Sequence, residues 1–122
     1  MANGTAVTLG EVIRDARVGL GISLRDLAKR VELAPSYLSD IENDRRVPSE
    51  EVLQRLADEV KLKFDDLMAL AGRVGDQTER YMKRHPAAGL LFRKISDKRL
   101  RDEDLESLLK TVETMGSKKR GP

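Results

Sequence analysis

The chain has 122 residues and a formal net charge of +2, which leaves room for one compact domain or for a small domain with an appendage. It has no cysteine, so disulfides, thiol nucleophiles and thiolate metal sites are excluded. No segment approaches the roughly 18 apolar residues of a membrane span, and the first residues lack the basic and apolar regions of a signal peptide. We therefore expect a cytoplasmic protein with no membrane partner.

The charges are unevenly distributed along the chain. Residues 1–72 carry 10 lysines and arginines against 13 aspartates and glutamates, whereas residues 73–122 carry 13 against 8. The first part is therefore acidic by three charges and the second part basic by five. Such an asymmetry is one indication of a nucleic-acid or membrane partner.

Three short helices are expected within residues 8–44. Thr8 and Glu11 have the spacing of a capping box and begin the first helix. Ser23 begins the second, which ends before Pro35 because a proline disfavours helical geometry at the preceding residue. Pro35 itself suits the first turn of the third helix. The apolar residues expected to face inward from the first two helices are Leu9, Val12, Ile13, Ala16, Leu20, Leu24, Leu27, Ala28 and Val31.

Two further helices follow a break at residues 47–49. Ser49 caps the fourth helix, and Phe64 begins the fifth, which Gly72 closes. Five short helices without any alternating strand pattern predict an all-α domain over residues 8–72. The residues expected to face inward are Val52, Leu53, Leu56, Ala57, Val60, Leu67, Met68, Leu70 and Ala71.

A second helical segment, with two to three helices, is expected over residues 73–116. A weak helix covers Gln77 to Arg84, Pro86 begins another, and a strongly amphipathic helix comes last. Residues 1–7 are expected to be a flexible arm, and the basic residues 117–122 a disordered tail.

Residues 23–43 have the spacing of a helix-turn-helix. Two helices are separated by a turn of three to four residues, which Leu33 fills while Leu27 and Ile41 hold the pair together. A helix with short polar groups outside can enter the major groove of duplex DNA, and the N–H groups at both helix starts suit phosphate oxygens. The residues left outside on the second helix are Ser36, Tyr37, Ser39 and Asp40.

Four short motifs accompany this helix-turn-helix. They are Ser23-x-x-x-Leu27-Ala28, Pro35-Ser36-Tyr37-Leu38-Ser39, Ile41-Glu42 and Arg46-x-Pro48-Ser49. With these motifs the chain resembles the Xre-like family, the helix-turn-helix of phage Cro and repressor type, from Leu9 to about Gly72. The resemblance implies the five-helix domain of phage repressors, which agrees with the number of helices expected from the apolar spacing.

The resemblance also implies roles for individual residues. An ion pair between Arg17 and Glu42 would tie the first helix to the third. Glu32 and Asp44 stand where the family usually has glycine, and Leu24 where it often has a polar side chain, so that only the Leu24 backbone N–H is expected to serve. Bases would be read by Pro35, Ser36, Tyr37, Ser39 and Asp40, and phosphates contacted by Ser23, Leu24, Arg25, Asn43, Arg45 and Arg46.

The last helix carries an apolar stripe that it cannot bury alone, and the helix before it supplies a matching face. These faces pack either on the first domain or against a second copy of the chain. We expect a homodimer, because one small domain touches only a few base pairs and a two-fold dimer doubles the contacts. The expected dimerisation residues are Leu91, Phe92, Ile95, Leu105, Leu108, Leu109 and Val112.

These features predict a sequence-specific transcriptional regulator of double-stranded DNA, acting as a homodimeric repressor at an inverted-repeat operator. The alternative is an antitoxin, whose C-terminal helices bind a toxin while the first domain autoregulates the operon. A protein partner, either a toxin or a protease, is left open. With one isolated histidine, no cysteine and no phosphate loop, neither catalytic residues nor a metal or cofactor are expected.

Overall fold

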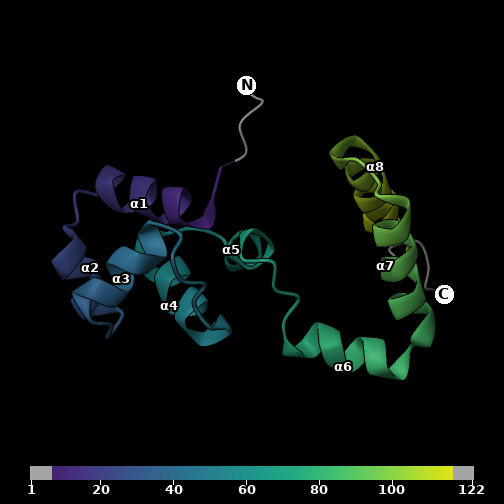
Figure 1. Ribbon diagram of the computed structural model, residues 1–122, viewed down its shortest axis with the longest axis horizontal. Helices are drawn as coiled ribbons and strands as arrows, with labels where there is room; N and C mark the ends of the chain where they lie inside the picture. The colour runs from purple at the N-terminus through teal and green to yellow at the C-terminus, as the bar shows by residue number, and fades with distance from the viewer. Residues whose placement is uncertain (1–6, 117–122) are drawn as a thin grey trace. The chain divides into compact units, whose positions relative to one another are not determined.

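The computed structural model describes residues 7–116, which form eight α-helices in two compact units that divide between Asp76 and Gln77 (Figure 1). No strand occurs in this part of the chain, so the prediction of an all-α protein is confirmed. Residues 1–6 and 117–122, most of the expected arm and the whole expected tail, lie outside the described residues.

Helix α1 (Leu9–Gly19) begins at the capping box that the sequence predicts. The Glu11 N–H donates to Thr8 Oγ1 at 3.1 Å, and the Thr8 N–H donates to Glu11 Oε1 at 3.1 Å. Leu20 was expected to face inward, but it is the C-cap residue of α1 and its side chain is 41% exposed. The expectation fails there because the helix ends before the apolar stripe does.

Helices α2 (Leu24–Arg30) and α3 (Pro35–Glu42) are joined by a turn of residues 31–34 and pack against each other. Ser23 caps α2, because its Oγ accepts the Asp26 N–H at 3.0 Å. Glu32 in the turn has φ of +60°, a left-handed conformation that favours glycine. Its carboxylate lies 3.4 Å from Arg55 Nη1, so an ion pair to α4 accompanies this unfavourable backbone conformation.

Helices α4 (Glu50–Val60) and α5 (Phe64–Leu70) complete the first unit. Ser49 caps α4 by accepting the Val52 N–H at 3.2 Å. Leu70 was expected to be buried but is 39% exposed, because it is the last residue of α5. After α5 the chain is held to the loop before α4, since Arg73 Nε donates to the Pro48 carbonyl at 2.8 Å.

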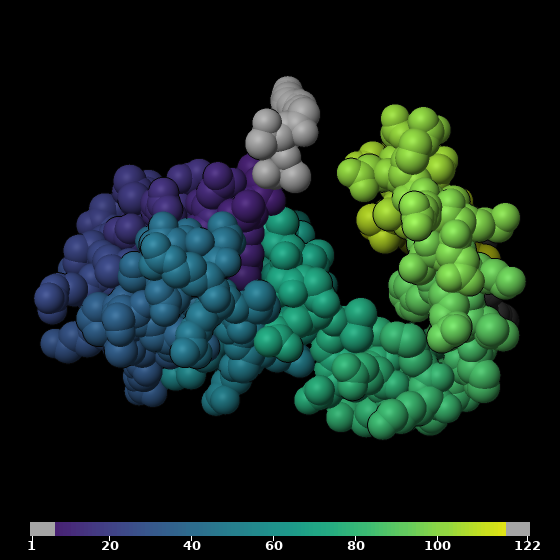
Figure 2. Space-filling view, in the orientation of Figure 1, coloured from purple at the N-terminus to yellow at the C-terminus, as the bar shows by residue number. Residues whose placement is uncertain are grey.

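The core of the first unit is aliphatic and is shared by all five of its helices. Figure 2 shows the outer surface of this unit, where atoms coloured from purple to teal lie against one another. Helices of seven to eleven residues are marginal alone in water, so this shared burial stabilises the five helices of the first unit. The buried apolar residues are Leu9, Ile13, Ile22, Leu27, Ala28, Val31, Leu38, Ile41, Val52, Leu53, Leu56, Ala57, Val60, Leu67 and Met68.

The second unit contains most of α6 (Asp76–Arg84), together with α7 (Pro86–Lys98) and α8 (Asp102–Thr114). A left-handed residue, Arg99 with φ of +52°, turns the chain between α7 and α8. No residue within these three helices as described is buried, in contrast to the first unit. Across residues 7–116, every helix is too short or too polar to span a bilayer.

Candidate nucleic-acid interface

Helix α3 has one buried face and one face open to solvent. Leu38 and Ile41 are completely buried and attach the helix to the core. Ser36 is exposed, while Tyr37 and Ser39 are half-buried at the edge of the outer face. The four positions expected to face outward on this helix are thus reachable from solvent, since Asp40 is also half-buried.

The first turn of α3 has no side-chain cap. Ala34 is the N-cap, and Pro35, which has no N–H, is the first helical residue. The amides that follow, at Ser36 and Tyr37, have no acceptor within the helix, because the first turn of any helix lacks them. The positive end of the helix dipole is therefore available at an exposed surface, where it favours a phosphate oxygen.

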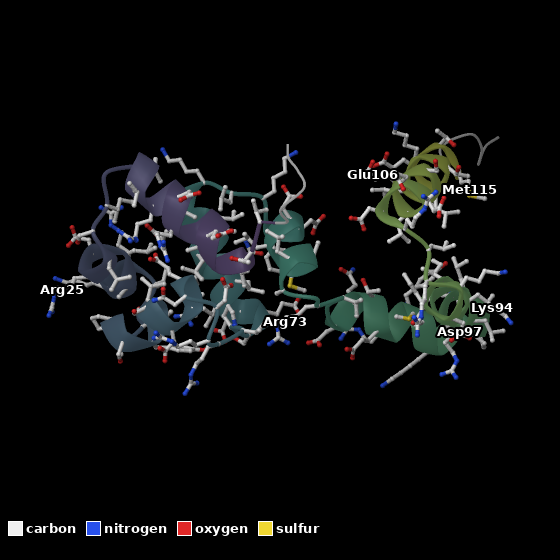
Figure 3. All side chains as sticks on the ribbon, turned by 45° about the horizontal axis from the view of Figure 1, so that its top comes forward. Arg25, Arg73, Lys94, Asp97, Glu106 and Met115 are labelled. Atoms are coloured by element: carbon white, nitrogen blue, oxygen red, sulfur yellow. The ribbon has the colours of Figure 1, made fainter. Side chains whose placement is uncertain are left out.

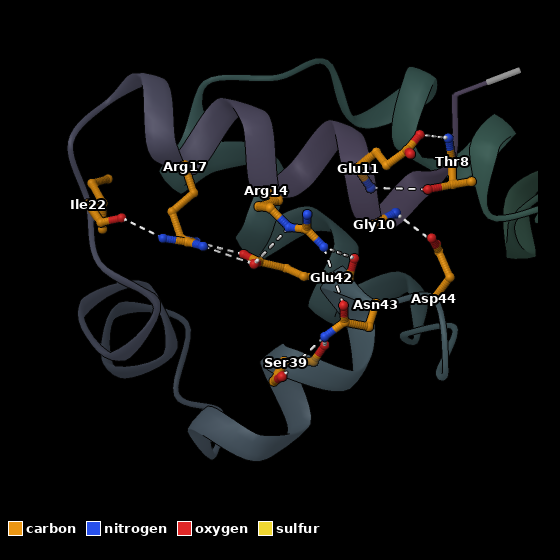
Figure 4. Close-up of polar contacts among 10 residues, drawn as sticks. All are labelled: Thr8, Gly10, Glu11, Arg14, Arg17, Ile22, Ser39, Glu42, Asn43 and Asp44. Carbon is orange, nitrogen blue, oxygen red and sulfur yellow. Dashed lines mark hydrogen bonds and ion pairs between the residues drawn. The ribbon is translucent and has the colours of Figure 1, made fainter. Parts of the chain in front are cut away.

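A buried ion pair fixes the other end of α3 to α1, as Figure 4 shows. Arg17 Nε donates to Glu42 Oε2 at 2.7 Å and Arg17 Nη2 donates to Glu42 Oε1 at 3.0 Å. Arg17 also donates through Nη1 to the Ile22 carbonyl at 2.9 Å. Glu42 is only 4% exposed, so the carboxylate depends on this bidentate partner for its compensation.

Its hydrogen bond with Glu42 raises the pKa of Arg17 above its ordinary value. A raised pKa in the folded state adds stability that is present below the unfolded value and lost as the pH rises past the folded one. For an arginine this loss falls in strong alkali, so the contribution of the pair to folding is constant around neutral pH.

A second polar network links α1 to the residue that follows α3 (Figure 4). The Asn43 amide Nδ2 donates to the Ser39 carbonyl at 2.9 Å and to Ser39 Oγ at 3.3 Å. Arg14 Nη2 in turn donates to Asn43 Oδ1 at 3.3 Å. The two expected DNA-contacting side chains, Ser39 and Asn43, are therefore already held in place by neighbours.

A third cluster brings expected base-reading and phosphate-contacting residues together. The Arg46 guanidinium lies 5.0 Å from the centre of the Tyr37 ring, in cation–π geometry. The Asp40 carboxylate faces Arg45 Nη1 at 3.5 Å and Arg46 Nε at 3.9 Å. Arg45 and Arg46 remain 69% and 62% exposed, so both can still meet a phosphate.

The start of α2 places three further expected contacts at the surface. Ser23 and Arg25 are exposed, and Arg25 extends away from α2 (Figure 3). Leu24 is half-buried against the core, which leaves only its backbone N–H for a phosphate. Because α2 and α3 pack against each other, one helix pair carries both this group of expected contacts and that of α3.

Two residues shape this surface through a contact that the sequence did not predict. Asp44 has φ of +60°, and its Oδ1 accepts the Gly10 N–H at 2.9 Å, at the start of α1. The negative charge of Asp44, which adjoins the expected phosphate contacts Asn43 and Arg45 in the chain, is thereby partly offset by the N-terminus of α1. Gly10 lies so close to the end of α3 that a Cβ atom at this position would clash with the backbone there. The only signal of this contact in the sequence is a glycine inside a helical pattern.

Sequence reasoning also missed Arg14, because its partners lie 28 and 29 residues further along the chain.

Among residues 7–116 no group of three or more histidine, cysteine, aspartate or glutamate side chains converges as a metal site.

Sequence comparison relates the chain to known proteins. A family model described as "Helix-turn-helix" matches residues 13–67. The transcriptional regulator ClgR of Mycobacterium tuberculosis is 32% identical over 79 residues, which cover 65% of this chain and 70% of ClgR. The chain belongs to the Xre-type helix-turn-helix family of transcriptional regulators.

Two other relatives of this Xre-type protein illustrate the similarity. The HTH-type transcriptional regulator DdrOP3 of Deinococcus deserti is 39% identical over 70 residues, covering 57% of this chain and 54% of DdrOP3. Among solved structures, the P22 c2 repressor in complex with a synthetic operator is 29% identical, covers 51% of this chain and 94% of that one, and has a TM-score of 0.49.

Proposed function

We propose that this Xre-type regulator binds double-stranded DNA sequence-specifically as a homodimer and represses transcription by covering a promoter at an inverted-repeat operator. The observation that carries the proposal is the outer face of α3, where small polar side chains lie beside two exposed arginines. The small groups suit base edges in a major groove about 12 Å wide, and the arginines suit the flanking phosphates. In this proposal Pro35, Ser36, Tyr37, Ser39 and Asp40 meet the bases, and Ser23, Leu24, Arg25, Asn43, Arg45 and Arg46 the backbone.

The homodimer is supported by a groove in the second unit. It has a volume of about 290 Å³ and is lined by seven apolar side chains from α7 and α8, the same seven expected to form the dimer interface. Six of the seven are between 38% and 58% exposed. An exposed apolar surface of this kind is typical of a protein interface. Here it lies on the helical hairpin formed by α7 and α8. The seven are Leu91, Phe92, Ile95, Leu105, Leu108, Leu109 and Val112.

Charge complementarity favours a second copy as the occupant of this groove. Helix α7 carries three basic residues and one acidic residue, whereas α8 carries five acidic residues and one basic residue. Two hairpins related by a two-fold axis can place α7 of one copy beside α8 of the other, so that opposite charges border the apolar contact. In a dimer of this kind, the α3 helices of the two copies would each enter the major groove at one half-site, and the two half-sites would be about 34–36 Å apart.

The DNA contacts are tested by band shifts on an operator selected from random duplexes. We expect Arg46→Ala to weaken operator binding and to reduce the salt slope by about 0.9, since one phosphate contact is lost. Ser36→Ala is expected to weaken binding to the operator by roughly 1–3 kcal/mol and to leave binding to random duplexes unchanged.

The matched control is Lys63→Ala, which removes one positive charge at an exposed position after the C-terminal end of α4. It should leave operator affinity almost unchanged. Unaltered affinity in folded Arg46→Ala and Ser36→Ala proteins would reject this assignment of the interface.

The dimer is tested by one charge in the groove. We expect Leu108→Asp to convert the protein to monomers in sedimentation experiments, because it buries a carboxylate in an apolar contact. Operator affinity should fall with it. Leu90→Asp is the control, since Leu90 is 59% exposed on α7 and does not line the groove. A Leu108→Asp protein that sediments as the wild type would show that the groove is not the dimer interface.

A further inference from the structure

Asp40 is the one acidic side chain on the outer face of α3, and it does not point freely at solvent. Its two carboxylate oxygens face different arginines, with Oδ1 3.5 Å from Arg45 Nη1 and Oδ2 3.9 Å from Arg46 Nε. The side chain is 36% exposed. Asp40, a candidate for reading a base, thus forms ion pairs with two residues that are candidates for contacting phosphates, Arg45 and Arg46.

Arg46 is held from a second direction by an aromatic ring. Its guanidinium lies 5.0 Å from the centre of Tyr37, which packs against the core of the first unit. The ring and the Asp40 carboxylate together restrict where this guanidinium points. A restricted arginine loses less conformational freedom when it binds a phosphate. The neighbouring carboxylate, however, offsets part of the positive charge that attracts the phosphate.

These exposed ion pairs contribute little to folding, because pairs of this type are worth about 0–1 kcal/mol. Their effect on DNA binding is larger, since attraction to any duplex depends on arginine charges that displace counterions from phosphates. A carboxylate beside those arginines cancels part of that attraction and is itself repelled by the DNA backbone.

We infer that Asp40 is a specificity-determining residue whose carboxylate, paired with Arg45 and Arg46, weakens binding to every duplex that does not offer it a hydrogen-bond donor. This inference rests on the proposed function. An ionised carboxylate only accepts hydrogen bonds, and in the major groove the cytosine amino group is a donor. At a site with cytosine in reach the carboxylate is satisfied, whereas elsewhere it is desolvated without a partner, which is discrimination by a repulsive element.

The test compares the wild-type 122-residue chain with Asp40→Asn, a substitution that removes the charge but keeps the shape and an acceptor oxygen. We expect Asp40→Asn to bind a random-sequence duplex roughly five- to tenfold more tightly at about 0.1 M salt, with a salt slope steeper by about 0.9. Affinity for the operator selected by the wild type should change less, so the ratio of operator to random affinity falls. Fluorescence anisotropy over a salt series measures both quantities.

Two controls separate the inference from a general effect of charge. Asp15→Asn removes the same charge at an exposed position of α1 and should change random-duplex affinity by less than twofold. In a background that carries both Arg45→Gln and Arg46→Gln, the gain from Asp40→Asn should be clearly smaller, because the arginine charges that the carboxylate offsets are gone and only its direct repulsion and desolvation remain.

The inference is overturned if Asp40→Asn behaves like Asp15→Asn, or if its gain is undiminished without the two arginines. It is also overturned if Asp40→Asn weakens only operator binding, which would make Asp40 a plain base reader. A wild-type protein that retains no duplex even at low salt would overturn the proposed function itself. The two failures are therefore distinguishable.

Discussion

Replacing Gly10 with alanine is expected to destabilise the first unit by about 3 kcal/mol or more, a large part of the 5–15 kcal/mol that is typical of a small domain. A Cβ atom at this position would lie 2.4 Å from the Glu42 carbonyl oxygen and 2.6 Å from the Ile41 carbonyl oxygen. Both obstacles are backbone atoms at the end of α3, so no side-chain rotation relieves the clash. Helix α1 would have to move away from α3.

Gly19→Ala is the matched control, because it lies in the same helix and a Cβ there meets nothing within 4 Å. We expect it to change the free energy of unfolding by less than about 1 kcal/mol, in the stabilising direction, since alanine is the better helix former. Urea titration followed by far-ultraviolet circular dichroism measures both variants, and hydrogen exchange of α4 amides reports on the first unit alone. Equal stability of the two variants would mean that α1 and α3 are not in close contact.

Arg17→Met is expected to lower the free energy of unfolding by about 3–5 kcal/mol, because it leaves Glu42 buried without its bidentate partner. Methionine keeps the apolar length of the side chain, so the loss reports mainly on the charge. Arg14→Met is the comparison: Arg14 Nε is 4.0 Å from the same carboxylate, but its side chain is 45% exposed. That pair should be worth less than about 1 kcal/mol.

A double variant tests the reason for the loss at Arg17. Adding Glu42→Met to Arg17→Met should recover a large part of the stability, because a buried ion pair replaced by apolar groups of similar size leaves no uncompensated charge. Chemical denaturation of the four proteins of the cycle gives the coupling energy. A loss in Arg17→Met no larger than that in Arg14→Met would contradict the structural role of the pair.

The helices and the helix-turn-helix could be predicted because their signals are local. Thr8 with Glu11, Ser23 and Ser49 cap helices within three residues of themselves, and these hydrogen bonds are present in the structure. Apolar spacing also identified the inner faces of α1, α2 and α4. It failed at Leu20 and Leu70, since spacing does not show where the helix stops.

Part of the candidate interface followed from a family pattern, and the rest depends on contacts between distant residues. The pattern placed Arg17 and Glu42 in one ion pair across 25 residues, and the structure contains that pair. It gave no indication that Asp44 accepts the Gly10 amide, 34 residues away, or that Arg14 holds Asn43. It also assigned Asp40 and Arg46 to separate tasks, although their side chains face each other.

The sequence by itself determined that this protein is all-α and where the helices of its first unit begin. It also determined that a helix-turn-helix lies near the N-terminal end, because caps and apolar periodicity act over one or two turns. Only the tertiary structure decided which helix backbones touch, as at Gly10 and Glu42, and which charges neutralise one another, as at Asp40 and its arginines. The physical reason is that such distances depend on how whole helices pack, and packing is settled by the shared core rather than by the spacing of residues along any one helix.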